Sequence, residues 1–485
     1  MTSPKIAIPT LAETGEATEE EVINKVAKAR QAYSSWHRLS YRARANHLLE
    51  VRRKLIKNLD EIVDLIVEET GKVSTEAIVN EILVTCELMS YYARRGEGFL
   101  RTQRVPVGIA IHKWAEVRYQ PLGVVAVISP WNYPFVLTMG PVATALFAGN
   151  TVVLKPSEVT PRVGVAIGRL FASMDEFADI VQVVTGGGKV GQALITQPVD
   201  KIAFTGSVQT GKSVMKAAAD NLTPVLLELG GKDAMIVLAD ADLDRAAAGA
   251  VWGAFTNCGQ TCMAVERVYV LEDVYEPFLN KVVEITNKVR EGQGDSADIG
   301  ALTYERQYDI VQHQLEDALQ TGAKVLAGGN SMRVGTRKSI SPTVLVEVSP
   351  DTEMMQQETF GPLLPITKVS NVEEAIQLAN QSSFGLSASV WGKNKKTIQQ
   401  VVYELKAGSV SVNDVMISYA IPSLPFGGVG ASGFGRTHGR EGLLEFCAVK
   451  AVAHDWLGLK REPHWLPLPR WLGKTAKLYL KARYG

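Results

Sequence analysis

The stretch GVVAVISPWNYPFVLTMGPVATALFAGNTVVLKPSE (residues 123–158) decides the fold class of this sequence. It begins with a short, β-branched apolar run at 123–129, which is typical of a buried strand. A helix is predicted over 138–148 and ends at a Gly-Asn pair, and a second strand follows at 151–155. Strand, turn, helix and strand in this order predict a βαβ unit of a parallel sheet covered by helices.

The same region contains no Lys, Arg, Asp or Glu from Tyr119 to Leu154, which raises the alternative of a membrane span. Pro130, Pro134 and Pro141 interrupt it, however, and two asparagines lie inside it. A spanning helix tolerates such interruptions poorly without protein neighbours. We therefore interpret the stretch as the buried part of an α/β domain.

On both sides of this unit the sequence predicts further helices and strands. Residues 17–100 are mostly helical, with capping residues and charge pairs, and 104–123 alternate apolar and polar residues as a hairpin does. Short apolar strands alternate with helices up to about residue 230. A second α/β series follows, from "DAMIVLAD" to "LPITKVS".

The composition excludes several classes of protein. The length of 485 residues favours two or three domains, and the 51 Lys and Arg balance the 51 Asp and Glu, so the net charge gives no attraction to nucleic acid. Four cysteines in so long a chain do not form a disulfide framework. The N-terminus turns acidic where a signal peptide would have its apolar core. We therefore expect a cytoplasmic protein that binds no nucleic acid.

Residues 456–485 differ from the rest in holding seven Lys or Arg, one acid and three Trp. In a helix from about Leu468, apolar residues share one face, and the opposite face carries Arg470, Lys474, Lys477 and Lys481. Such a basic amphipathic helix can lie on an anionic membrane surface, or it can dock on its own subunit or a neighbouring one. Both alternatives stay open at this point.

Two glycine-rich turns follow predicted strands and indicate a nucleotide site. The first, "VVTGGGKVGQAL", has the pattern G-x-G-x-x-G at Gly186, Gly188 and Gly191. It lacks the acidic residue that a dinucleotide fingerprint has about twenty residues later. The second, "FTGSVQTGK", contains Gly206, Ser207 and Gly211. Small residues at such turns let backbone N–H groups and a helix N-terminus approach a pyrophosphate.

The segment "LKPSEVTP" supplies polar side chains where the strand 151–155 ends. Lys155 leaves the carboxyl end of this strand, where ligands bind in open α/β sheets, and Ser157 and Glu158 follow. A Lys and a Glu there can hydrogen-bond ribose hydroxyls, and a carboxylate repels a 2′-phosphate, which favours NAD over NADP. The alternative is a surface ion pair at a helix start, with Ser157 or Thr160 as the cap.

Two cysteines lie four residues apart in "NCGQTC" (257–262), and they could form a metal clip, a disulfide, an inert core pair or a reactive site. A zinc site is disfavoured because the pair lacks a second pair of ligands and no histidine lies between Ala254 and Val270. We expect no metal. The other interpretations cannot be separated by the spacing alone.

Four motifs in this order and spacing, "SPWNYP", "LELGGKD", "GQTC" and "ETFGP", resemble the aldehyde dehydrogenase superfamily. "LKPSE", "FTGS", "VNDV" and "LPFGGVGASGFGR" match further positions, and the resemblance covers about residues 20–455. It implies an α/β, aldehyde dehydrogenase-like fold with a Rossmann-type cofactor domain, an α/β catalytic domain and a small oligomerisation element. The expected divisions are a cofactor-binding domain at 1–103 and 121–230, a catalytic domain at 231–440, an oligomerisation element at 104–120 and 441–455, and a basic extension at 456–485.

The resemblance also implies the catalytic residues. Cys262 matches the nucleophile, whose thiolate attacks the aldehyde carbon and, after hydride transfer, carries a thioester. Glu228 matches the general base that activates the hydrolytic water, and Asn132 matches a donor to the thiohemiacetal oxygen. Cys258 is then expected in the tunnel wall, either as a small apolar filler or as a helical i,i+4 thiol able to form a reversible disulfide with Cys262.

The cofactor residues come from the same resemblance and from the glycine-rich turns. Glu358 and Phe360 match the residues that hold the nicotinamide ribose and ring. Ile128 and Leu229 are expected to contact the cofactor mainly through their backbones. The remaining expected contacts to NAD, or alternatively NADP, are Trp131, Lys155, Ser157, Glu158, Gly186, Gly188, Gly206, Ser207 and Gly211. The family also implies a homodimer or homotetramer.

The substrate tunnel is expected to be mostly apolar, and its loop "DVMISYAIPSLPFGG" contains no basic residue. This favours an apolar long-chain or aromatic aldehyde over succinate semialdehyde, whose carboxylate would need an Arg or a Lys. A CoA-acylating enzyme is less favoured, because that group typically lacks the carboxylate at the position of Glu228. A non-catalytic binding protein is the remaining alternative. The expected tunnel residues are Tyr133, Leu137, Trp252, Thr256, Cys258, Thr261 and 414–424.

Overall fold

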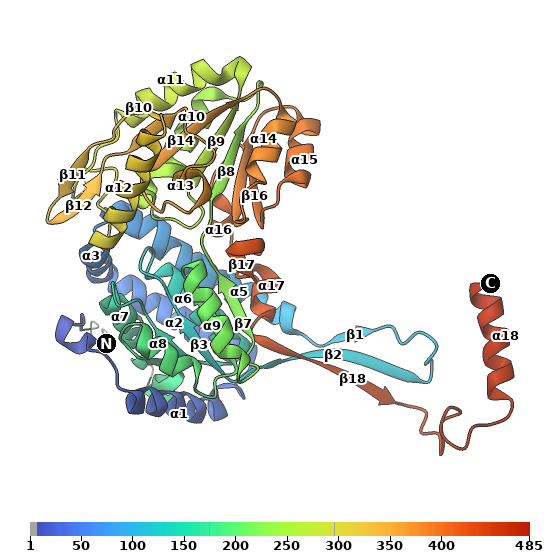
Figure 1. The fold of residues 1–485 in the computed structure, drawn as a ribbon. Coiled ribbons are helices and arrows are strands. Elements are labelled where there is room, and N and C mark those ends of the chain that lie inside the picture. Colours follow the sequence, from blue (N-terminus) through green and yellow to red (C-terminus); the bar gives the residue numbers. More distant parts are fainter. Residues whose placement is uncertain (1–6, 174, 295) are drawn as a thin grey trace. The chain divides into compact units, whose positions relative to one another are not determined.

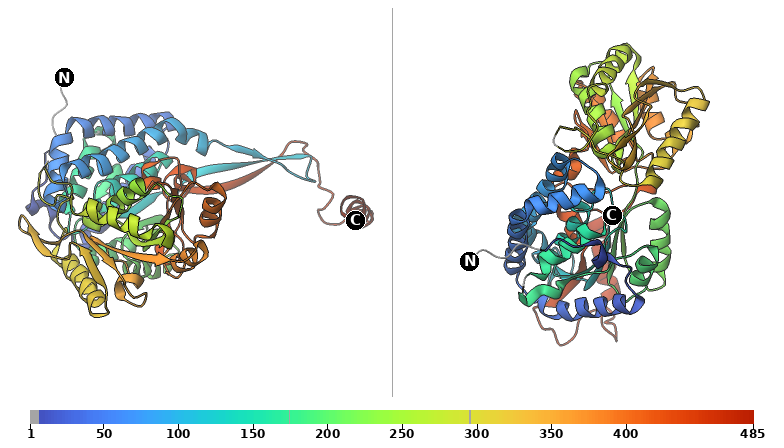
Figure 2. Two further views of the ribbon diagram at one scale, coloured as in Figure 1. Left: turned by 90° about the horizontal axis from the view of Figure 1, so that it is seen from above. Right: turned by 90° about the vertical axis from the view of Figure 1, so that its left-hand side faces the viewer.

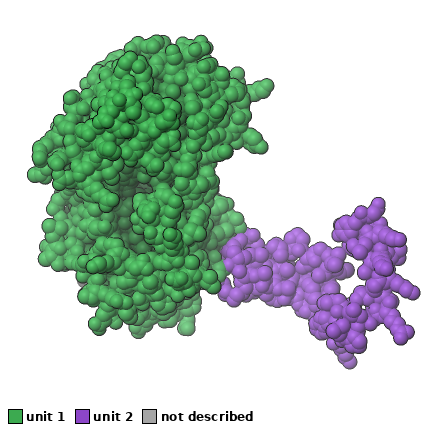
Figure 3. Space-filling view, in the orientation of Figure 1, with its two compact units in different colours: residues 1–100, 121–448 green, residues 101–120, 449–485 purple. Residues whose placement is uncertain are grey.

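The computed structural model describes residues 7–173, 175–294 and 296–485, and the chain divides into two compact units. Unit 1 comprises residues 1–100 and 121–448, and unit 2 comprises residues 101–120 and 449–485 (Figure 3). Within the described ranges, unit 1 contains two large sheets.

The first sheet of unit 1 has the strand order β17-β7-β6-β3-β4-β5 in the described part of the chain. Its strands pair in parallel except β17, which is antiparallel to β7. The strands are β3 (Val124–Ile128), β4 (Thr151–Lys155), β5 (Val181–Val183), β6 (Lys201–Thr205), β7 (Val225–Glu228) and β17 (Gly433–Phe434). The predicted βαβ unit is confirmed as β3, α6 and β4 (Figure 1).

Helices cover both faces of this sheet, which explains why its strands are apolar on both sides. Apolar residues of α1, α8 and α9 pack on one face against alternate residues of the strands, such as Val124 and Ile202. The helical segments of this half are η1 (Leu11–Thr14), α1 (Glu19–Trp36), α2 (Tyr41–Lys57), α3 (Leu59–Thr70), α4 (Ser74–Glu76), the π-helix η2 (Ala77–Leu83), α5 (Val84–Leu100), α6 (Val136–Ala148), α7 (Pro161–Ala172), η3 (Asp175–Ile180), α8 (Gly188–Ile195) and α9 (Val208–Ala219).

The predicted Gly-Asn pair ends α6 and also positions the two strands. Gly149 is left-handed, with φ of 102°, and a Cβ there would collide with the guanidinium of Arg44. The side-chain oxygen of Asn150 accepts hydrogen bonds from the backbone N–H groups of Leu122 and Gly123, at 2.7 and 2.9 Å. The end of the helix is therefore tied directly to the start of β3.

The second sheet of unit 1 has the order β10-β13-β14-β9-β8-β15-β16 within the described residues, parallel except for β10. Its strands are β8 (Asp233–Val237), β9 (Val265–Leu271), β10 (Lys324–Ala327), β13 (Thr343–Val346), β14 (Leu363–Val369), β15 (Ser387–Trp391) and β16 (Ser409–Val412). Strands β11 (Ser331–Val334) and β12 (Arg337–Ile340) form a separate hairpin. The expected second α/β series is confirmed, although β15 and β16 were not among its predicted strands.

The helices that follow β7 in unit 1 are yellow-green to red in Figure 2 and lie mostly around the second sheet, although the last of them, at 439–444, packs on α5 and α6. They are α10 (Leu243–Phe255), η4 (Thr256–Gly259), η5 (Glu272–Val274), α11 (Tyr275–Thr286), α12 (Glu305–Gln320), α13 (Glu353–Gln356), α14 (Val372–Ala379), α15 (Lys395–Glu404), α16 (Ile417–Ala420), η6 (Gly430–Ser432) and α17 (Gly439–Leu444). The chain crosses from the first sheet to the second between β7 and β8, through the segment Leu229 to Lys232.

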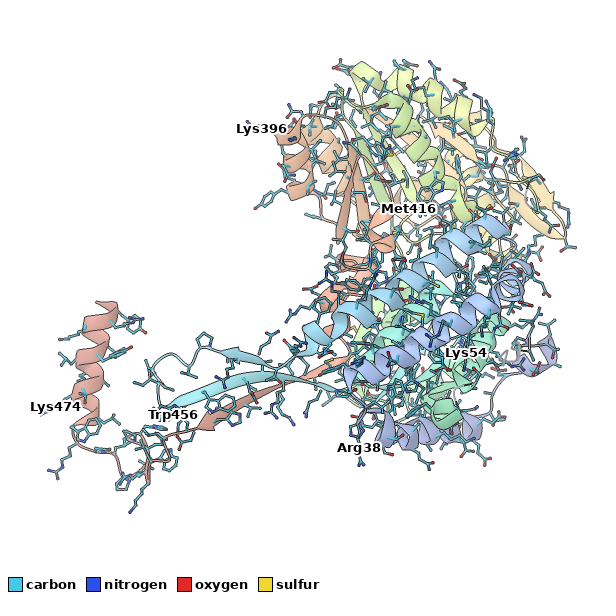
Figure 4. All side chains as sticks on the ribbon, turned by 180° about the vertical axis from the view of Figure 1, so that it is seen from behind. Arg38, Lys54, Lys396, Met416, Trp456 and Lys474 are labelled. Carbon is cyan, nitrogen blue, oxygen red and sulfur yellow. The ribbon has the colours of Figure 1, made fainter. Side chains whose placement is uncertain are left out.

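Unit 2 contains the predicted hairpin and a third strand. Strands β1 (Gln103–Val105) and β2 (Lys113–Pro121) are antiparallel, and β18 (Cys447–Asp455) pairs with β2. Helix α18 (Leu472–Tyr484) begins four residues later than predicted, and Pro469 disfavours helical conformation at Leu468, the predicted first residue. Its side chains are exposed or partly exposed, and Lys474 is labelled in Figure 4. None of the described helices is long and apolar enough to cross a membrane.

Candidate active site

Two cavities of unit 1 meet at Cys262. The first is a groove of about 730 Å³ that contains the carboxyl ends of β3, β4, β6 and β7, and the face of unit 1 shown in Figure 3 is hollowed. The second is a mostly apolar cavity of about 140 Å³. Cys262 lines both, and Asn132 and Glu228 line the groove with it. The structure thus brings the three expected catalytic residues to the end of a parallel sheet, where ligands bind in folds of this kind.

A sharp turn after α10 presents Cys262. Asn257, Cys258 and Gly259 are three consecutive left-handed residues, with φ between 52° and 72°. A Cβ at Gly259 would collide with the carbonyl group of Gly361, so the turn passes directly against the loop that carries "ETFGP". The helical relation expected between the two cysteines is therefore absent.

Cys258 does not belong to the tunnel wall, and that expectation is corrected. Its side chain is buried among Leu302, Val311 and Leu315, and its sulfur lies 3.5 Å from the Ser339 hydroxyl. Cys258 lines neither cavity. Burial raises its pKa to about 12, so the thiol stays protonated and unreactive at neutral pH.

Glu228 ends β7 as a buried carboxylate. Neither of its oxygens has a hydrogen-bond partner among the described residues. Burial raises the pKa of Glu228 to about 7, and the neighbouring Cys262 thiol opposes this rise. Burial and the carboxylates of Glu228 and Glu358 raise the pKa of Cys262 well above its usual range. The thiol is therefore protonated in this state, and a group with a pKa near 7 lies beside it to take the proton.

Asn132 is buried in the loop between β3 and α6. Its side-chain amide donates to the carbonyl oxygen of Gln260 at 3.0 Å, which couples this loop to the turn that carries Cys262. The backbone oxygen of Asn132 accepts hydrogen bonds from Lys72 at 2.9 Å and from the Asn257 side chain at 3.0 Å. The side-chain amide that is expected to bind the substrate oxygen is thus positioned by Gln260, and the backbone of the same residue is positioned by Lys72 and Asn257.

A buried ion pair supports this loop. The Lys72 ammonium donates to Glu81 at 2.6 Å and lies 4.1 Å from the centre of the Tyr133 ring. The other oxygen of Glu81 accepts from the backbone N–H groups of Phe135 and Val136 at the start of α6. Both side chains are fully buried, and Glu81 lies in the π-helix η2, a feature that is frequent at functional sites.

A second buried ion pair holds the opposite wall of the groove. Lys232 donates to Glu266 at 2.6 Å and to the Thr359 hydroxyl at 3.0 Å. Glu266 in turn accepts from the backbone N–H groups of Thr359 and Phe360. Glu358 accepts from the backbone of Gly231 at 2.9 Å, while burial and the nearby Glu266 raise the pKa of Glu358 well above its usual range.

Most of the expected cofactor residues line the groove. Lys155 lies 3.4 Å from Glu158 at the end of β4, and Ser207 caps α9 by accepting from the backbone of Thr210. Gly186 and Gly211 do not line the groove: Gly186 precedes α8 with φ of 139°, and Gly211 packs against Leu229. The expected residues that line it are Ile128, Trp131, Lys155, Ser157, Glu158, Gly188, Gly206, Ser207, Leu229, Glu358 and Phe360.

The apolar cavity contains most of the expected tunnel residues. Tyr133 donates to or accepts from Thr261 at 2.9 Å, and both line it with Leu137 and Trp252. Thr256 does not, because its hydroxyl is turned to Glu76, to which it donates at 3.0 Å. From the loop 414–424 the cavity includes Asp414, Val415, Met416, Ile417, Tyr419 and Ala420, and Figure 4 labels Met416.

Several residues of the site carried no motif signal. Lys72, Glu76 and Glu81 look like surface charges of the helical N-terminal region, and only the fold shows them buried. Tyr304 forms an edge contact with Trp131, at 5.0 Å between ring centres, and lines the groove from the second half of unit 1. No spacing rule links such distant positions, so the sequence alone could not identify them.

A strand-end groove that meets a buried cysteine beside a buried carboxylate is typical of an α/β enzyme with a cysteine nucleophile. The chain belongs to the aldehyde dehydrogenase family, whose model matches residues 3–452. It is therefore an oxidoreductase acting on aldehydes.

Two relatives and two solved structures illustrate the match. The chain is 43% identical to 4,4'-diapolycopene aldehyde oxidase of Methylomonas sp, over 95% of this chain and 87% of the relative. It is 37% identical to a provisionally named succinate-semialdehyde dehydrogenase (NADP+) 2 of Mycobacterium ulcerans, over 90% and 85%. An NAD-dependent aldehyde dehydrogenase from Sinorhizobium meliloti matches with a TM-score of 0.87 at 35% identity, covering 93% and 89% of the two chains. An NADP-dependent enzyme of E. coli gives 0.86 at 32% identity, covering 91% of each.

The buried pair Lys72–Glu81 yields a prediction about stability. Lys72→Met leaves Glu81 buried without its cation, so the free energy of unfolding should fall by about 3–5 kcal/mol. A lower urea midpoint of unfolding would measure this. The double variant Lys72→Met with Glu81→Gln removes both charges but keeps a side-chain oxygen for the N–H groups of Phe135 and Val136, so it should recover most of the loss. Equal midpoints for the Lys72→Met variant and the unaltered protein would contradict the argument.

Proposed function

We propose that this chain oxidises an aldehyde to its carboxylic acid with a nicotinamide cofactor, through Cys262, Glu228 and Asn132. One observation carries the proposal: Cys262 lines both the apolar cavity and the strand-end groove, beside a buried carboxylate without a partner. The aldehyde would occupy the apolar cavity, and the cofactor the groove. The reacting carbon would then lie at the sulfur where the two meet.

The protonated thiol requires a base, and Glu228 is the carboxylate placed for it. Glu228 takes the thiol proton as the sulfur bonds to the aldehyde carbon, and Asn132 and the backbone N–H of Cys262 hydrogen-bond the oxygen that becomes negative. A donor of this kind is worth about 2.7–4 kcal/mol in the transition state. The cofactor, when bound, supplies the acceptor for the hydride. Once Glu228 has released the thiol proton to water, it takes a second proton from the water that attacks the thioester, and the carbon–sulfur bond breaks to leave the acid and the Cys262 thiolate.

The groove fits a nicotinamide dinucleotide. Ser207 and the N-terminus of α9 supply N–H groups suited to a pyrophosphate, and Lys155 and Glu158 supply partners for ribose hydroxyls. The Glu158 carboxylate disfavours a 2′-phosphate, which supports NAD as the preferred cofactor. Glu358 and Phe360 would hold the nicotinamide end.

An apolar aldehyde is the proposed substrate class. No Lys or Arg lines the apolar cavity in the described part of the chain, and Asp414 lies in its wall, which would repel a substrate carboxylate. Succinate semialdehyde is the second candidate. The two relatives are named for a diapolycopene aldehyde and for succinate semialdehyde, so their names correspond to the two classes.

The other parts of the chain keep the roles expected from the resemblance. We propose that the first half of unit 1 binds the cofactor, that the second half carries the nucleophile, and that the sheet of unit 2 pairs subunits in a homodimer or homotetramer. The extension 456–485 exposes Trp456, Trp465 and Trp471 among basic residues. This supports a role as a contact surface, for an anionic membrane or for protein.

Cys262→Ala should reduce aldehyde-dependent NADH formation by about a thousandfold or more, because it removes the group that forms the covalent intermediate. Cys258→Ala is the matched control: it alters a buried thiol of the same loop and should keep most of the turnover. NADH absorbance with a panel of aldehydes measures both. Comparable turnover in the two variants would exclude Cys262 as the nucleophile.

The pH dependence of kcat should reflect Glu228. Because its pKa is raised to about 7, the carboxylate becomes available as a base only as the pH rises through that value, so kcat should rise about tenfold per pH unit below 7 and level off above it. Glu228→Gln should lower turnover and remove this rise of kcat with pH. If the variant keeps the same rise, another titrating group is responsible for it.

A series of unbranched aldehydes should separate the two substrate classes. Burial of each added methylene in the apolar cavity should raise kcat/KM by about three- to fourfold until the cavity is full. Succinate semialdehyde should be a poor substrate, and Asp414→Asn should improve it without changing the values for apolar aldehydes. Succinate semialdehyde as the best substrate would support the second candidate instead.

A further inference from the structure

A third cavity of unit 1 lies behind Glu228. It measures about 20 Å³, which exceeds the roughly 10–15 Å³ that one water molecule requires. Its polar walls include Glu228, Tyr419 and His438, and the rest is largely apolar. Glu228 also lines the groove, and Tyr419 also lines the apolar cavity. This small cavity therefore touches both parts of the proposed active site without belonging to either.

Four polar atoms at this cavity have no hydrogen-bond partner among the described residues. They are the two carboxylate oxygens of Glu228 and the two ring nitrogens of His438. Unpaired buried polar groups are rare, because each costs about as much as a lost hydrogen bond, and buried water is their usual partner. A water in this cavity would accept from one group and donate to the other.

The backbone of His438 is strained, which marks the position independently. Its φ of 61° and ψ of 175° lie in a region that is essentially restricted to glycine. The surrounding structure keeps this conformation and buries the imidazole inside unit 1, where its ring packs on Tyr419 at 4.5 Å between ring centres. Non-glycine residues in such conformations cluster at functional sites.

The chemistry of a buried imidazole suits proton transfer. Burial lowers the pKa of His438 to about 4, so the ring is neutral at neutral pH, with one nitrogen that accepts and one that donates. Such a ring can take a proton on one nitrogen and release another from the opposite nitrogen. Thr437, which lines the cavity beside His438, is partly exposed to solvent.

We propose that the small cavity holds a water molecule through which His438 receives the proton that Glu228 takes up during thioester hydrolysis. The proposal rests on the proposed function. In the hydrolytic step the attacking water loses a proton to Glu228, its oxygen bonds to the acyl carbon, and the bond from that carbon to the Cys262 sulfur breaks. The proton passes from Glu228 through the cavity water to one nitrogen of His438, and the other nitrogen releases a proton toward solvent.

The stoichiometry of the reaction requires Glu228 to release protons in every turnover, and the small cavity offers a route apart from the groove. Oxidation of an aldehyde by NAD⁺ and water yields a carboxylate, NADH and protons, so a base buried as deeply as Glu228 has to pass protons on in every turnover. His438 does not touch the substrate or the cofactor in this arrangement. It acts through Glu228 as a proton-transfer residue.

His438→Gly tests the proposal. Glycine adopts this backbone conformation without strain, so the variant is expected to fold, and the thermal unfolding midpoint checks this. We expect kcat to fall roughly 10- to 100-fold, with the rapid first turnover of NADH within twofold of the unaltered enzyme. Intact-protein mass spectrometry should show acyl adduct accumulating on Cys262. Added imidazole, which can enter the space left by the side chain, should restore part of the rate.

His438→Asn is the matched control. Asn tolerates positive φ and can hydrogen-bond a water, but its amide does not take up or release a proton near neutral pH, so it should show the same loss of kcat. A kcat within twofold of the unaltered enzyme in either variant would overturn the proposal, as would a parallel fall of the first turnover without adduct. Absence of aldehyde turnover in the unaltered protein would instead reject the proposed function.

Discussion

The carboxylate of Glu228, buried beside the Cys262 thiol without a hydrogen-bond partner, is the feature on which the rest of the site depends. A cation in contact with it would lower its pKa and make it a weaker base. The two fully buried lysine side chains near the catalytic loops, Lys72 and Lys232, are each held 2.6 Å from a carboxylate of their own. Their charges are therefore satisfied elsewhere, and burial, opposed only by the neighbouring Cys262 thiol, raises the pKa of Glu228.

The same ion pairs position the loops that approach the thiol. Lys72 and Glu81 hold the backbone around Asn132, and Glu266, paired with Lys232, holds Thr359 and Phe360. Buried pairs of this kind add little net stability, since desolvation offsets their attraction, but a broken pair is costly, so the loops have one favoured arrangement. Glycine completes the approach: a Cβ at Gly231 would collide with the carbonyl oxygen of Cys262.

The sequence predicted those features that are set by neighbouring residues, and it missed those that depend on contacts between distant parts of the chain. Local patterns succeeded, as with the βαβ unit around Gly149 and Asn150, because apolar periodicity and turn residues act within a few positions. Cys258 was misplaced because four-residue spacing suggests a helix, whereas three left-handed residues reverse the chain there. The serine-rich strands β15 and β16 lack the apolar run that identifies a buried strand. Burial of Lys72 and Glu81 depends on contacts across the fold, which no short pattern encodes.

The apolar cavity favours the exclusion of water from the site, whereas a reaction that releases protons needs water or polar groups to carry them away. The walls that would bind an apolar aldehyde exclude bulk water, and the same burial raises the pKa of both Glu228 and Cys262. Proton transfer is then limited to positions where a water can be bound and where polar atoms are free to bind it. The cavity between Glu228 and His438 has both the room and the unpaired atoms. The small cavity thus offers a defined place for water on the far side of the base, apart from the apolar cavity.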